Sequence, residues 1–156
     1  MPRRLFGWLG NAGCPSIATV YGVFAVVIGL VLPLVLIPII RYTGYSEVVE
    51  EVAKALVVVF LILRLPTHWG QLTAGVLFGF LFGASENLLY LNQIFQSGDI
   101  AVFWERFLWT APMHAITVLI MVFSGLVHRW WVVAGLIGAV IVHALFNSIV
   151  VSILLR

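Results

Sequence analysis

Charged residues and cysteine are both scarce in this sequence. Asp, Glu, Lys and Arg make up 9% of its 156 residues and hydrophobic residues 63%, whereas soluble domains carry about 25% charged residues. A soluble chain of this length could not bury so much apolar surface, so we expect it to reside in lipid. The single cysteine, Cys14, excludes an internal disulfide and a thiolate metal site. A net charge of only +2 offers no basic patch, and we expect no nucleic-acid partner.

Five apolar runs of about 20 residues are present, the length that an α-helix needs to cross a bilayer. Pro66 ends the second run, a polar NQIFQSGD stretch ends the third, and His128 to Trp130 separates the fourth from the fifth. We therefore predict an all-α polytopic membrane protein, a bundle of about five transmembrane helices joined up and down by short loops. The runs cover residues 16–40, 47–65, 71–96, 100–127 and 131–155.

The N-terminal residues 1–15 lack the apolar core and cleavage site of a secretory signal peptide. We interpret them as an interfacial segment ahead of a single transmembrane helical domain, residues 16–156. The lysines and arginines of the short flanks favour a cytoplasmic N-terminus and an outside C-terminus. We expect the protein to reside in the plasma membrane. One side of the membrane would hold Arg3, Arg4, Arg64 and Arg129, and the other Arg41 and Arg156.

Four of the five predicted helices carry polar residues inside or at the ends of their apolar runs. An ionisable group in a bilayer costs on the order of 3 kcal/mol or more, so it marks a functional site by default. With alternating helices rising about 1.5 Å per residue, these groups fall within reach of one another in one half of the bundle. They are Glu50, Glu51 and Lys54; Glu86, Asn87 and Tyr90; Arg106 and His114; and His143 and Asn147.

Helical spacing predicts which of these groups share a face. Glu50 and Lys54 are four residues apart with the acid first, a favourable order for an ion pair, whereas Glu51 points about 100° away. Glycines also recur every four residues, at Gly75, Gly79 and Gly83. Small residues let membrane helices approach closely, so we interpret this ridge as packing.

Carboxylates and histidines together are suited to activating a water molecule. A buried carboxylate can act as general base and then as general acid, and the Asn147 amide or a histidine N–H can stabilise an oxyanion. No serine is placed as a nucleophile with a clear base partner, and Cys14 lies outside the bundle. The pattern therefore favours peptide hydrolysis by a Glu/His-activated water.

The motifs EEVAK, FGASENLLY, a mid-span His and HALFN follow one another on successive predicted helices. In this order they resemble the PrsW family of intramembrane proteases and, more distantly, the CAAX-protease and bacteriocin-processing group. The resemblance implies a membrane endopeptidase that cuts membrane-anchored peptides or proteins and depends on Glu and His residues. It implies catalytic roles for Glu50, Glu51, Glu86, His114, His143 and Asn147, with either Glu50 or Glu51 as the base, and supporting roles for Lys54, Asn87 and Tyr90. We expect a supporting role for Arg106 as well, because it is an ionisable residue within the fourth apolar run.

Three alternatives to this metal-free protease stay open. We expect no cofactor, but Glu86, His114 and His143 could hold zinc as a two-His, one-carboxylate set, although no HExxH motif is present. A proton-coupled transporter or binding module would also use buried Glu and His, and the lack of an obvious inverted repeat argues against it. The third alternative is a non-catalytic scaffold. The expected partners are the lipid bilayer and a membrane-anchored substrate.

Overall fold

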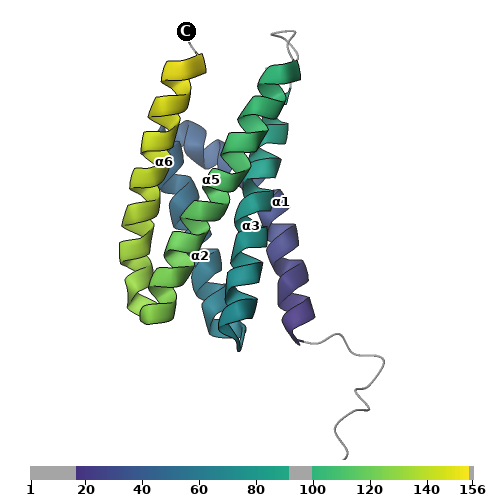
Figure 1. Ribbon diagram of the computed structural model, residues 1–156, viewed down its shortest axis with the longest axis vertical. Coiled ribbons are helices and arrows are strands. Elements are labelled where there is room, and N and C mark those ends of the chain that lie inside the picture. The colour runs from purple at the N-terminus through teal and green to yellow at the C-terminus, as the bar shows by residue number, and fades with distance from the viewer. Residues whose placement is uncertain (1–16, 92–99, 155–156) are drawn as a thin grey trace, which may run out of the picture.

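The computed structural model of the chain describes residues 17–91 and 100–154, and all regular structure in these ranges is helical. The long helices lie side by side as a bundle (Figure 1). The prediction of an all-α bundle with five long helices is therefore confirmed. The elements are α1 (Ile17–Thr43), α2 (Ser46–Arg64), α3 (His68–Leu89), α5 (Ile100–Val127), the short 3₁₀-helix η1 (Arg129–Trp131) and α6 (Val132–Leu154).

Four helical segments are long and apolar enough to cross a bilayer, and the chain is an integral membrane protein. They are Thr19–Thr43, His68–Leu89, Ile100–Val127 and Arg129–Ile149. Helix α2 differs, because five of its 19 residues are ionisable. The outer surface of the bundle is apolar, as lipid requires, with large side chains such as Leu34, Leu108 and Ile137 more than half exposed.

The turn between α1 and α2 depends on Gly44. Its φ of +76° lies in the left-handed region, which a residue with a Cβ seldom adopts. Its amide donates to the Ile40 carbonyl at 2.8 Å and so closes the end of α1. Helix α2 begins two residues later, and Arg41 near the end of α1 lines the same cavity as Ser46 at the start of α2.

Helices α3 and α5 approach each other closely along the glycine ridge. A Cβ on Gly79 would lie 2.7 Å from the His114 carbonyl oxygen, and a Cβ on Gly83 would lie 2.7 Å from the His114 ring. The packing interpretation of this ridge is confirmed. Two consequences follow for the site: His114 is fully buried against α3, and the last turn of α3 is brought up to its ring.

The third helix is shorter than its apolar run suggests. It ends at Leu89, and the Tyr90 amide turns back to the Asn87 carbonyl at 3.2 Å. The prediction that it continues to residue 96 extends into 92–99, which lies outside the described residues. The interfacial segment predicted for residues 1–15 also lies outside them.

Candidate active site

A polar cavity of about 270 Å³ lies in the half of the bundle where α2 and α5 begin and α3 and α6 end. Side chains from all four of these helices line it, as does Tyr90 just beyond α3. Seven of the ten polar residues predicted to converge line this cavity, and Glu51, Lys54 and Asn87 do not. The lining residues are Ser46, Glu47, Glu50, Glu86, Tyr90, Arg106, Thr110, Met113, His114, His143, Phe146 and Asn147.

Glu51 is the most heavily bonded acid of the cluster. Its Oε1 accepts from Lys54 Nζ at 2.7 Å and lies 2.8 Å from His143 Nδ1, and the Thr117 hydroxyl donates to it at 3.4 Å. Lys54 Nζ lies 3.9 Å from Glu50. Sequence spacing predicted the opposite, with Glu50 paired to Lys54 and Glu51 freer. Residues three apart also share a helix face. The contacts of His143 and Thr117 hold the Glu51 carboxylate beside Lys54, so Lys54 pairs with Glu51.

His114 connects α2 with α3. Its Nδ1 lies 2.6 Å from Lys54 Nζ, and its Nε2 lies 2.5 Å from Glu86 Oε2. A lysine ammonium can only donate, so Nδ1 accepts from Lys54 and Nε2–H donates to the Glu86 carboxylate. The other Glu86 oxygen, Oε1, lies 3.6 Å from Arg106 Nη2. Glu86 is thus held from two sides, while its side chain keeps 15% of its surface exposed at the cavity.

Glu50 and the two histidines form a possible metal-binding set. One ligand atom from each of Glu50, His114 and His143 lies within 4.8 Å of the others, and Glu50 Oε2 is buried without a hydrogen bond. The Glu51 contact to His143 Nδ1 leaves Nε2 of that ring without a hydrogen bond among the described residues, an arrangement common around metal-binding histidines. The set contains Glu50 where the sequence interpretation named Glu86, and Glu86 instead contacts His114.

The remaining predicted residues divide between the cavity and its surroundings. Asn147 lines the cavity and donates to Glu47 Oε1 at 2.9 Å, and the Arg106 guanidinium lies over the Tyr90 ring at 4.1 Å. Asn87 does not line the cavity. It is fully buried, and its amide donates to the Phe103 carbonyl at 3.4 Å, which links α3 to α5.

Glu47 and Thr117 belong to the cluster, although no role in the site was predicted for either from the sequence. A signal for Glu47 was present. It stands three and four residues before the double Glu and seven before Lys54, so all four lie on one stripe of α2. Thr117 follows His114 by three residues, and its hydroxyl also donates to the His114 carbonyl at 3.1 Å. Its role depends on α2, so spacing along α5 alone could not identify it.

Comparison with known proteins gives one match. The family model described as PrsW family intramembrane metalloprotease covers residues 5–155, nearly the whole chain. No curated protein and no solved structure matches. The word metalloprotease in that description leaves the metal-free expectation without support and is compatible with the metal-dependent alternative.

Proposed function

Because the chain belongs to the PrsW family of intramembrane proteases, we propose that it cleaves membrane-anchored peptides or proteins with a water activated in the polar cavity. The family is one of peptide-bond hydrolases, and the substrate class and the mechanism are our proposals. The observation that carries them is the convergence of Glu50, His114 and His143 beside Glu86 in one cavity of a membrane bundle.

The family description implies a metal ion, and the residues fit one. Two imidazoles and a carboxylate are a common ligand set for a catalytic zinc, and the buried Glu50 Oε2 has no hydrogen bond to give up. Glu50, His114 and His143 would hold the ion, and His114 would release either Lys54 or Glu86 to do so. A divalent ion bound there supplies Lewis acidity that polarises a carbonyl and activates a water.

Glu86 is our candidate for the general base. Glu51 is fully buried and bonded to Lys54, His143 and Thr117, so it serves to position them. Glu86 faces the cavity, and its Oε1 has no hydrogen bond within the described part of the chain. Oε1 would take a proton from the attacking water and return it to the leaving amine, the sequence expected of a carboxylate that acts as base and then acid.

We propose two donors for the oxyanion that forms on the attacked carbonyl. Asn147 has two amide hydrogens, of which one is used by Glu47. The Arg106 guanidinium, which faces Glu86 across the cavity, supplies a permanent positive charge. Fixed donors in a site shielded from water stabilise such charge more than water does.

The site lies at the end of the bundle that contains the C-terminal half of α6. If the C-terminus is outside, as the flanking charges favour, the cavity opens on the non-cytoplasmic side of the plasma membrane. We propose this orientation, and with it a substrate cut at or near the outer boundary of the membrane.

The test is cleavage of a membrane-anchored substrate by purified protein in nanodiscs. Glu50→Gln and Glu86→Gln keep side-chain size and should each lower turnover by a factor on the order of 100 or more. Glu105→Gln is the matched control, because Glu105 lies exposed on α5 and does not line the cavity. Normal cleavage by both site variants would refute the proposed mechanism.

A further inference from the structure

A second cavity adjoins the first on the side of α1. It has a volume of about 290 Å³ and shares Ser46, Glu50, Glu86 and Tyr90 with the active-site cavity. The residues that line only this second cavity are apolar except for Arg41. They consist of Pro33, Ile37, Ile40 and Arg41 from α1, with Leu89 from α3. Small-molecule pockets range from about 300 to 1,000 Å³, so this space suits one side chain or chain end rather than a long segment.

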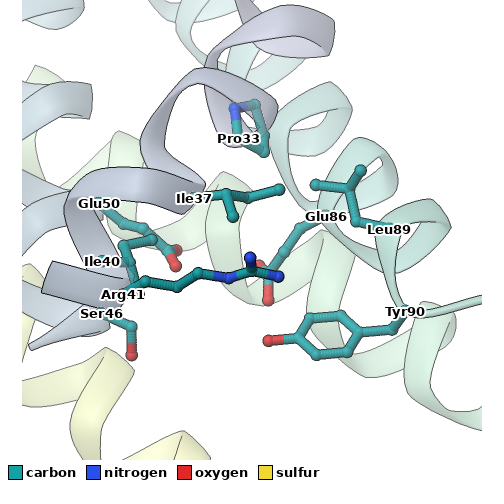
Figure 2. Close-up of a pocket in the computed structure, with 9 residues that line it drawn as sticks. All are labelled: Pro33, Ile37, Ile40, Arg41, Ser46, Glu50, Glu86, Leu89 and Tyr90. Carbon is teal, nitrogen blue, oxygen red and sulfur yellow. The ribbon is translucent and has the colours of Figure 1, made fainter. Parts of the chain in front are cut away.

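Arg41 supplies the positive charge of this second cavity. Figure 2 shows its side chain extending from the end of α1 into the cavity, toward the space between Glu86 and Tyr90. Within the described ranges it forms no ion pair within 4.0 Å and no hydrogen bond. The other two basic side chains near the site, Lys54 and Arg106, are both engaged with carboxylates.

The two carboxylates that line this cavity already have other partners. Glu86 is held by His114 and Arg106. Glu50 has Lys54 Nζ at 3.9 Å and, in the function proposed above, would also hold a metal ion. The free positive charge therefore belongs to Arg41. The Tyr90 phenol points into the same space from the opposite side and offers a second donor (Figure 2).

We propose that this cavity is a specificity subsite for a substrate residue bearing a carboxylate, which Arg41 binds with help from the Tyr90 hydroxyl. A guanidinium and a carboxylate pair through charge-assisted hydrogen bonds, and the apolar walls would cover the rest of the residue. The proposal rests on the proposed function, because the shared residues place the bound carboxylate next to the bond to be cut. The carboxylate belongs to a side chain or to the C-terminus of the substrate.

A lipid phosphate is the competing ligand for Arg41. A basic residue in the last turn of a helix is stabilised by the helix dipole and often reaches out to the headgroups. Arg41 is exposed at the surface of the bundle, but its side chain lines the cavity shared with the active site and extends toward Glu86 and Tyr90, which favours a ligand in the cavity. Arg64, in the last turn of α2, lines neither cavity and is the natural control.

Binding of labelled single-span peptides to the protein in phosphatidylcholine nanodiscs tests the proposal. The peptides carry Glu, Gln or Lys at one position near the membrane boundary, and a second pair ends there as a free acid or an amide. We expect a carboxylate of one kind to bind about 10-fold more tightly than its neutral match. The two pairs separate a side-chain carboxylate from a terminal one.

Charge reversal assigns the effect to Arg41. Arg41→Gln should remove the preference, Arg41→Glu should favour the Lys peptide, and Arg64→Gln should leave the preference unchanged. Equal binding of all peptides by the unaltered protein, or a preference that survives in Arg41→Gln, would overturn the subsite. Loss of the preference when phosphatidylglycerol replaces part of the phosphatidylcholine would assign Arg41 to lipid and overturn it as well.

Cleavage of the same peptides separates this proposal from the proposed function. Hydrolysis of the charged and neutral peptides at equal rates and with equal affinity would refute the subsite and leave the protease intact. Selective binding through Arg41 without hydrolysis of any peptide would refute the protease mechanism and support the anion site.

Discussion

Replacing Gly83 by Ala should abolish most of the cleavage activity without unfolding the helix bundle. The new Cβ would lie 2.7 Å from the His114 ring, 2.8 Å from Ala111 Cα and 3.0 Å from the Thr110 carbonyl oxygen. Two of these three neighbours are backbone atoms of α5, so no side-chain rotation can relieve the contact. Helices α3 and α5 must therefore separate until the closest contacts reach the ordinary 3.4 Å.

This separation should lower both the stability of the protein and its rate of cleavage. Overpacking of a closely fitted interior costs about 1–3 kcal/mol, so thermal unfolding in detergent should shift downward while the helical content stays constant. His114 would move relative to Glu86, its 2.5 Å partner on α3. A misplacement approaching 1 Å in a catalytic site can cost about 100-fold in rate, and we expect a loss of that order in peptide cleavage.

Gly138→Ala provides the matched control for this experiment. It makes the same chemical change on α6, but the nearest atom, Ile120 Cγ2, lies at 3.6 Å, which is an ordinary contact. We expect unchanged cleavage and unchanged stability. The reasoning would be refuted if Gly83→Ala cleaved its substrate at the normal rate, or if the Gly138 variant lost as much activity as the Gly83 variant.

Three further predictions concern charge, metal and topology. Glu51→Gln should lower stability by about 3–5 kcal/mol, measured by thermal unfolding, because it leaves the buried Lys54 ammonium without its closest carboxylate; an unchanged unfolding curve would contradict this. Phenanthroline should abolish cleavage and added zinc should restore it, and His143→Gln should lower the metal content per chain. Activity that persists through chelation would refute the metal-dependent mechanism. Cysteine at position 46, in a Cys14→Ser background, should react with an impermeant maleimide on intact cells. Labelling only after lysis would show that the orientation is opposite to the one proposed.

The fold and the gathering of the polar residues could be predicted because lipid makes strong demands on a sequence. Apolar runs must be helices, and ionisable groups within them must face one another. Alternating helices then placed Glu86, His114 and His143 in one half of the bundle, where the structure has them around a single cavity.

Pairing within the cluster was less accessible from the sequence. The choice of Lys54 between Glu50 and Glu51 depends on side chains from α5 and α6, and spacing along α2 carries no information about them. No site residue was predicted on helix α1. It does not contribute to the first cavity, but Arg41 at its end enters the second, because the Gly44 turn sets its position.

The buried chain of contacts has a consequence for biosynthesis. His143, Glu51, Lys54, His114 and Glu86 are linked in that order, and the chain passes through α6, α2, α5 and α3. Lys54 meets His114 only 60 residues further along, and Glu51 meets His143 only 92 residues further along. At a synthesis rate of about 5–20 residues per second, α2 exists for several seconds before its last partner.

During that interval Lys54 lacks His114 until α5 has been made, and Glu51 lacks His143 until α6 has been made. Lipid penalises ionisable groups without such partners strongly. The start of α2 should therefore favour the aqueous boundary over the bilayer until these partners are made. In this chain of contacts α6 supplies the last buried partner of α2. A nascent chain that stops before α6 should leave this turn of α2 exposed to water and accessible to quality-control proteases.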